Sequence, residues 1–166
     1  MPNPALDRAT IGLSLSTVSL LKSGRSRFCE GPSTNKSAIL ASTSEVGCAA
    51  GRVSVQDVEE KADLIGSAAV FVTQLEQPIP AALRALEIAR AAGVTTILNP
   101  APAATLPDAM LALCDYVTPN ESEAEALTGL PVTSVDEARI AAAALLAKGV
   151  GAVIITLGEN GALYHD

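Results

Sequence analysis

The pattern of apolar and polar positions becomes regular from about residue 52 to the end of the chain. Short apolar runs, which predict buried strands, lie at 69–74, 95–98, 115–118 and 152–156. Amphipathic stretches predict helices that start near Ser54, cover 81–92 and 107–114, follow Asn120, and cover 135–148. Strands that alternate with helices form parallel sheets with right-handed crossovers. The four strands should therefore point the same way.

The first part of the chain lacks such a pattern. Residues 1–51 contain nine serines and four threonines, whereas only four serines follow in the rest of the sequence. They also hold five Lys/Arg against three Asp/Glu, compared with six against fifteen in residues 52–166. We therefore expect 1–51 to be a low-order or foreign segment without a packed element, and 52–166 to form a partial α/β domain.

Composition narrows the classes of protein further. A chain of 166 residues is long enough for one domain, and aromatic residues make up only 2%, so the core must be aliphatic, as in helices packed on a parallel sheet. The net charge of −7 argues against binding to a nucleic-acid backbone. The apolar run at 11–21 is short and broken by serines, which predicts neither a signal peptide nor a membrane anchor. Three cysteines without C-x-x-C spacing fit a reducing cytoplasm.

A ligand site is expected at one edge of the predicted sheet. Ligands of open α/β sheets bind beyond the carboxyl ends of the strands. Polar and glycine-rich segments follow the four strands at 74–76, 99–100, 119–123 and 157–161. No P-loop and no G-x-G-x-x-G fingerprint is present in the sequence. His165, the only histidine, is expected to be a frayed terminal residue, and Cys114 a buried apolar residue.

Three glutamates crowd the start of the helix that follows Asn120. Acidic side chains in a first helical turn interact favourably with unpaired N–H groups and the helix dipole, which could explain Glu121, Glu123 and Glu125 together. Helical spacing separates them, however, because Glu123 lies three residues after Asn120 and should lean inward beside it. An inward carboxylate could hold Mg²⁺ while the asparagine amide contacts a nucleotide phosphate. The residues alone favour the capping explanation.

Two further features also have two interpretations. The segment TLGENG at 156–161 leaves a strand with two glycines three apart, which lets a backbone approach a phosphate or ribose, or simply forms a turn. Glu76 follows a strand and could accept hydrogen bonds from substrate hydroxyls, or be a solvated loop carboxylate. In each case the structural interpretation is favoured without further information.

Four segments together resemble the PfkB-type carbohydrate kinase family, over about residues 52–166. They are QLEQP at 74–78, NPAPA at 99–103, TPNESEAEALTG at 118–129 and TLGENG at 156–161. The resemblance implies a three-layer α/β fold with a mostly parallel sheet, incomplete at both ends in this chain. It also implies transfer of phosphate from ATP to a sugar hydroxyl with Mg²⁺. A pentose, with D-ribose as the leading candidate, is the expected substrate.

The same resemblance implies roles for individual residues. Glu76 would bind the sugar, Asn120 would contact ATP, and Glu123 belongs to an N-x-x-E magnesium motif. The ATP-binding loop would consist of Thr156, Leu157, Gly158, Glu159, Asn160 and Gly161. For complete members, the resemblance also implies a monovalent cation and homodimers. The resemblance assigns no role to Glu121 and Glu125, for which the capping explanation remains.

The sequence departs from the family pattern in two places. It contains no Gly-Ala-Gly-Asp segment, which in the family supplies the catalytic base and an anion-binding helix N-terminus, and it contains no Gly-Gly dipeptide of the sugar-binding region. No catalytic residue is therefore assigned. We expect a central kinase fragment that is inactive alone, preceded by a segment such as a shifted reading frame would produce. The alternatives are a noncatalytic nucleotide-binding or interaction module, or an unrelated α/β interaction domain.

Overall fold

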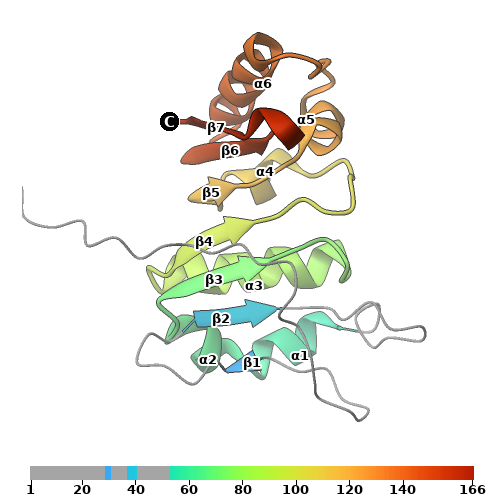
Figure 1. Cartoon of the computed structure of the whole chain (residues 1–166). Coiled ribbons are helices and arrows are strands. Elements are labelled where there is room, and N and C mark those ends of the chain that lie inside the picture. The colour runs from blue at the N-terminus through green and yellow to red at the C-terminus, as the bar shows by residue number, and fades with distance from the viewer. Residues whose placement is uncertain (1–28, 31–36, 41–52) are drawn as a thin grey trace, which may run out of the picture.

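The computed structural model describes residues 29–30, 37–40 and 53–166, and the strands within them form one sheet (Figure 1). Seven strands follow one another across the sheet in chain order. They are β1 (Cys29–Glu30), β2 (Ser37–Leu40), β3 (Val70–Thr73), β4 (Thr95–Leu98), β5 (Tyr116–Val117), β6 (Ala152–Thr156) and β7 (Ala162–His165).

Strands β2 to β6 are parallel to one another, and the outer strands β1 and β7 pair antiparallel with β2 and β6. One row of the register runs from Val72 through Ile97 and Tyr116 to Ala152. The expected mixed α/β fold with a mostly parallel sheet is confirmed, and the four strands predicted from the sequence point the same way.

Two expectations about the ends of the chain were wrong. We expected no packed element within residues 1–51, yet strands β1 and β2 join the sheet, and β2 pairs along its whole length with β3. The proposed domain boundary between residues 51 and 52 stays a prediction. His165 is not a frayed residue, because it lies in β7 and pairs with Val153 of β6. Hydrogen bonding to a neighbouring strand, which local sequence does not reveal, decides both cases.

Helices connect the parallel strands. They are α1 (Val55–Glu59), α2 (Ala62–Gly66), α3 (Ile79–Ala91), α4 (Asp108–Leu111), α5 (Glu121–Thr128) and α6 (Val135–Ala147). A reciprocal capping box between Ser54 and Asp57 starts α1. The helix expected from Ser54 onward is broken at Lys61, where ψ is 12°, and α2 continues after it. Gly93 ends α3 and Gly129 ends α5, both with a φ of 73°, which glycine adopts without a steric penalty.

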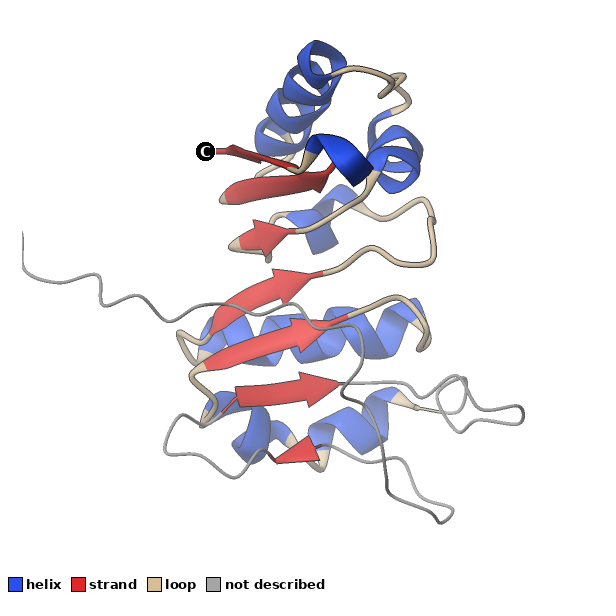
Figure 2. Cartoon of the chain, viewed as in Figure 1, coloured by secondary structure: helices blue, strands red, loops and turns tan. Residues whose placement is uncertain are grey.

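The connecting helices lie on one face of the sheet (Figure 2). When the strand order follows the chain order, successive right-handed crossovers place every helix on the same side. The described residues thus contain the sheet and one helical layer of the three-layer arrangement expected from the sequence. None of the helices in the described residues combines the length and the apolar character that a membrane span requires.

The core lies between this helical layer and the sheet. In β3 and β4 the buried residues alternate with half-buried ones, and Phe71, Leu98 and, in β6, Ile155 are fully buried. Helix α3 faces the sheet with four buried alanines, which let its backbone approach the strands closely: Ala81, Ala82, Ala85 and Ala89. This packing fixes the strands, and so it also fixes the loops that leave their carboxyl ends.

Candidate active site

The carboxyl ends of β5 and β6 are joined beyond the strands themselves. Asn120 and Thr156 form a parallel bridge, and the Thr156 N–H donates a hydrogen bond to the Pro119 carbonyl at 2.9 Å. Asn120 and Thr156 are both exposed. The structure therefore places the N-x-x-E motif beside the start of the TLGENG segment, as expected from parallel strands.

The carboxyl ends of β3 and β4 are joined in the same way. The Asn99 N–H donates to the Thr73 carbonyl, and the Leu75 N–H donates to the Ala101 carbonyl, both at 2.9 Å. Glu76 lies in the turn after β3 with an exposed side chain. The QLEQP and NPAPA segments are thus held together at the same sheet edge as Asn120 and Thr156.

Glu123 and Asn120 form the start of helix α5. The Glu123 N–H donates to Asn120 Oδ1 at 2.8 Å, and the Asn120 N–H donates to Glu123 Oε2 at 2.9 Å. Glu123 is only 8% exposed, whereas Glu121 is half-buried and Glu125 is exposed. The inward position expected for Glu123 is confirmed. The capping explanation also holds for it, since one carboxylate oxygen caps the helix and the other has no hydrogen bond within the described residues.

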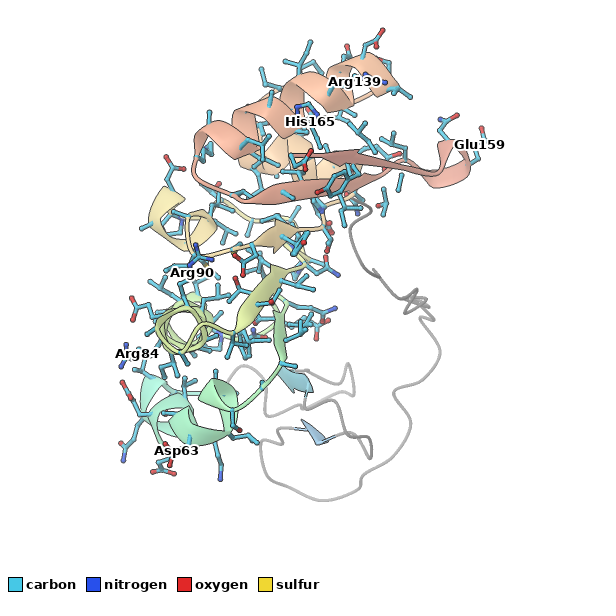
Figure 3. All side chains as sticks on the ribbon, turned by 90° about the vertical axis from the view of Figure 1, so that its left-hand side faces the viewer. Asp63, Arg84, Arg90, Arg139, Glu159 and His165 are labelled. Atoms are coloured by element: carbon cyan, nitrogen blue, oxygen red, sulfur yellow. The ribbon has the colours of Figure 1, made fainter. Side chains whose placement is uncertain are left out.

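The TLGENG segment forms a tight turn between β6 and β7. Residues Gly158–Asn160 make one turn of 3₁₀ helix, and the Leu157 N–H closes the loop on the Gly161 carbonyl at 2.8 Å. Gly158 and Gly161 have φ angles of 54° and 82°, which favour glycine. Leu157 is buried, whereas Glu159 extends outward from the tip of the turn, away from helices α1 to α4 (Figure 3). The loop therefore exposes its backbone at the site edge while Leu157 anchors it.

Few side chains at this edge could bind a metal ion. No group of three or more His, Cys, Asp or Glu side chains within the described residues could hold a metal ion. Mg²⁺ in phosphate-transfer sites is commonly bound by one or two carboxylates together with substrate phosphates and waters. Glu123, with one carboxylate oxygen outside the capping box, fits that sparse arrangement.

Gln77 is a polar residue of this edge that was missed in the sequence. It is 4% exposed, and its amide Nε2 donates to Thr73 Oγ1 and, at 2.7 Å, to the Gln74 carbonyl. The available signal was its place in QLEQP, immediately after Glu76. Its burial could not be inferred, because glutamine before proline in a loop is usually solvated.

Two surface clefts lie away from this edge. One lies between α2 and α3, and the other lies where strands β4, β5 and β6 begin, at the opposite edge of the sheet. Neither is lined by a residue expected to bind sugar, ATP or metal. A shallow edge formed by loops is open to solvent, so its site is recognised from the convergence of strand ends rather than from a cavity.

Beside the second cleft lies a charged network. Asp115 accepts hydrogen bonds from the Thr96 N–H at 2.9 Å and from Arg90. Burial alone would raise the pKa of Asp115, but these hydrogen bonds outweigh it and hold the pKa below its usual range. In the same region, burial raises the pKa of the Cys114 thiol to about 12. This edge thus holds a hydrogen-bonded ion pair, whereas the opposite edge carries the exposed residues expected to bind the substrates.

Comparison with known proteins identifies the family of the chain. The family model described as pfkB family carbohydrate kinase matches residues 31–166. The chain belongs to this family. The match to the pfkB family begins ahead of Arg52, where the resemblance read from the sequence began, and it includes β2.

Individual pfkB relatives are similar over part of their length. A ribokinase of Staphylococcus aureus is 48% identical over 109 residues, which is 66% of this chain and 36% of the relative. A deoxyribokinase of Salmonella typhi is 39% identical over 113 residues, 68% of this chain and 37% of the relative. The structure of Arabidopsis thaliana ribokinase complexed with ribose and ATP matches with a TM-score of 0.61 and 26% identity, over 64% of this chain and 34% of that one. The chain thus spans little more than a third of these relatives.

Proposed function

We propose that this chain belongs to an ATP-dependent pentose kinase that converts D-ribose to ribose 5-phosphate. The observation that carries the proposal is the convergence of four family segments at the carboxyl edge of β3 to β6, with Asn120 bridged to Thr156. The names of the relatives support a ribose-type sugar. ATP as phosphoryl donor agrees with the cytoplasmic location expected from the sequence.

The geometry supports a division of this edge between the two substrates. Glu76, exposed after β3, is the residue we propose to accept hydrogen bonds from sugar hydroxyls. The exposed Asn120 and the backbone of residues 156–161 lie together on the β5–β6 side, where we propose that ATP binds. A turn with two glycines at positive φ presents main-chain groups without side-chain obstruction.

Glu123 is proposed to hold Mg²⁺ through its free carboxylate oxygen, directly or through water. Bound Mg²⁺ would neutralise charge on the phosphates of ATP. The role of the protein is to fix that carboxylate, and the hydrogen bond from the Asn120 N–H does so by restraining the Glu123 side chain. The same contact links the metal-binding residue to the residue proposed to contact ATP.

We do not expect the 166-residue chain to catalyse phosphoryl transfer by itself. Phosphoryl transfer needs a residue that accepts the proton of the attacking hydroxyl, and the Gly-Ala-Gly-Asp segment that supplies it in the family is absent from this sequence. Binding without chemistry is therefore the activity proposed for the isolated chain.

Binding of the two substrates to the purified chain tests the proposal. We expect Mg²⁺-ATP to raise the unfolding temperature of the chain, and Asn120→Ala to abolish most of the shift, because Asn120 lies beside the ATP loop. Val135→Ala is the control, since Val135 is exposed on α6 and lies in none of the segments proposed to bind a substrate. Absence of any nucleotide effect on the wild-type chain would refute the ATP site. Ribose phosphorylation by the chain would instead refute its proposed inactivity.

The sugar is tested separately. Titration with D-ribose and with 2-deoxy-D-ribose compares the two substrates named for the relatives. If Glu76 accepts hydrogen bonds from ribose hydroxyls, Glu76→Ala should weaken ribose binding by about tenfold or more, the equivalent of one hydrogen bond to a charged group. Stronger binding of 2-deoxy-D-ribose would make that sugar the proposed substrate, and the phosphoryl transfer from ATP would stay the same.

A further inference from the structure

The turn that carries Glu76 is closed by the side chain of Gln77. Gln77 Nε2 donates to the hydroxyl of Thr73, the last residue of β3, and at 2.7 Å to the carbonyl of Gln74. The Thr73 hydroxyl in turn donates to the Gln74 carbonyl at 3.3 Å. Thr73 is fully buried and Gln77 is 4% exposed, so these contacts are shielded from water. These contacts join Gln77, which follows Glu76, to residues that precede it in the chain.

The orientation of the Gln77 amide is fixed by chemistry. The Gln74 carbonyl can only accept a hydrogen bond, so the NH₂ group of Gln77 must face it, and the amide oxygen must point the other way. That oxygen, Oε1, is the buried side-chain atom without a hydrogen-bond partner within the described residues. The side chain is therefore held by its donors alone.

Fold stability alone does not favour glutamine at this position. A buried acceptor without a partner loses its hydration and gains nothing in exchange, and an apolar side chain of similar size would avoid that loss. Buried unpaired groups call for a specific explanation, and functional sites are one of the places where they occur. The two hydrogen bonds that Gln77 donates offer the explanation, because they order the turn next to Glu76.

The turn is also held from the other side, so that Glu76 lies between two fixed points. The Leu75 N–H donates to the Ala101 carbonyl at 2.9 Å, which joins the turn to the NPAPA segment after β4. Glu76 itself is exposed, and no hydrogen bond restrains its carboxylate within the described residues. Its direction is therefore set mainly by the backbone, which the contacts of Gln77 and Leu75 hold in place.

We propose that Gln77 is a positioning residue that orients Glu76 for binding of the sugar. The inference rests on the proposed sugar kinase function, in which Glu76 accepts hydrogen bonds from sugar hydroxyls. Gln77 does not touch the sugar, since its amide is buried and its donors are used within the turn. It acts by fixing the backbone of residues 74–77 before the sugar arrives, which lowers the entropy lost on binding.

The test variant is Gln77→Met, which keeps the length of the side chain and removes both the donors and the unpaired oxygen. Gln56→Met is the matched control, because Gln56 is exposed on α1 at a position without these contacts. Amide hydrogen exchange of Leu75 reports on the turn without any substrate. Titration with D-ribose and with Mg²⁺-ATP reports on the two sites separately, and urea denaturation reports on global stability.

For Gln77→Met we expect Leu75 to exchange at least about tenfold faster and ribose to bind at least about tenfold more weakly, as for the loss of one hydrogen bond. Global stability should stay the same or rise, and the affinity for Mg²⁺-ATP should not change. A side chain with a merely structural role would lower stability and both affinities together. Gln56→Met should change none of these quantities.

Three outcomes would overturn the inference. Unchanged exchange of Leu75 would show that Gln77 does not hold the turn. Unchanged ribose affinity, in a chain whose ribose binding is lost in Glu76→Ala, would show that the turn does not matter for the sugar and would leave the proposed function intact. Absence of ribose binding by the wild-type chain would overturn the sugar site itself. If Gln77→Met does not fold, Thr73→Val removes the other partner of the Gln77 amide and provides the same comparison.

Discussion

Asn120 and Glu123 exchange hydrogen bonds at the first turn of α5, at 2.8 and 2.9 Å. This pair is compatible with both interpretations of Glu123, as a helix cap and as a Mg²⁺ ligand. One oxygen of the Glu123 carboxylate completes the capping box, and this contact fixes the side chain in a buried position. The second oxygen is the one proposed to hold Mg²⁺. Capping is thus the means by which the proposed metal-binding carboxylate is positioned.

Glu123→Gln separates the two roles. Glutamine keeps an oxygen that accepts from the Asn120 N–H, so the free energy of unfolding should fall by no more than about 1 kcal/mol, from the lost charge at the helix start. The Mg²⁺-dependent part of ATP binding should weaken by about tenfold or more, because the amide is a poor ligand for Mg²⁺. Glu125→Gln, on the same helix but exposed, is the control. Equal ATP affinity for the wild-type chain and Glu123→Gln would exclude Glu123 as the metal ligand.

Gly151→Ala should be destabilising by about 1–3 kcal/mol. A Cβ at this position would lie 2.8 Å from the Asp115 carbonyl oxygen, a backbone atom that cannot move without disturbing β5. Gly66→Ala is the matched control, because its Cβ would meet only the Ala92 Cβ at 3.4 Å. As Gly66 lies in α2, alanine there should stabilise by up to about 1 kcal/mol. Urea denaturation of the two variants should give changes of opposite sign, and equal changes would contradict the packing described for Gly151.

Asp115 should make stability depend on pH in the acid range. Its folded pKa is lowered, so its contribution is present above the unfolded value of about 3.9 and is lost as the pH falls through the folded pKa. Asp115→Asn should cost about 1 kcal/mol at pH 7, since Arg90 is half exposed and screened by solvent. That difference from wild type should shrink below pH 4. Asp108→Asn, which breaks an exposed pair with Lys148, should cost less than about 0.5 kcal/mol at both pH values.

Cys114 should resist alkylation in the folded chain. With a pKa raised to about 12 and 2% exposure, only about one thiol in ten thousand is ionised at pH 8, and the sulfur is not accessible to the reagent. Treatment with iodoacetamide followed by peptide mass analysis should show Cys114 unmodified in buffer and modified in urea. Rapid modification under native conditions would mean that the packing around α4 opens readily.

Several elements could be read from the sequence because their signals are local. The strands Thr95–Leu98 and Ala152–Thr156 have the predicted bounds, since glycine precedes each apolar run closely and a polar segment ends it. The start of α5 was predicted from Asn120 and Glu123, whose spacing of three residues belongs to the capping box itself. The inward position of Glu123 also followed from helical periodicity.

Other features could not be predicted, because they depend on contacts between segments that are distant in the sequence. Strands β1 and β2 have no apolar period, and they exist because a neighbouring strand satisfies their backbone. Strand β7 was not predicted, and its pairing with β6 gives His165 a fixed place. The burial of Gln77 depends on how the turn after β3 packs against the segment after β4, which residues next to it in the chain do not encode.

The sequence by itself determined the family, the direction of the parallel strands and the residues that gather at their carboxyl ends, because these depend on local motifs and on the handedness of crossovers. Tertiary structure alone decided which of those residues touch. Asn120 meets Thr156 because β5 and β6 are neighbours in the sheet, and Gln77 closes the turn of Glu76 because Thr73 is buried beneath it. Such contacts arise from the packing of the whole sheet, so no single segment of the sequence specifies them.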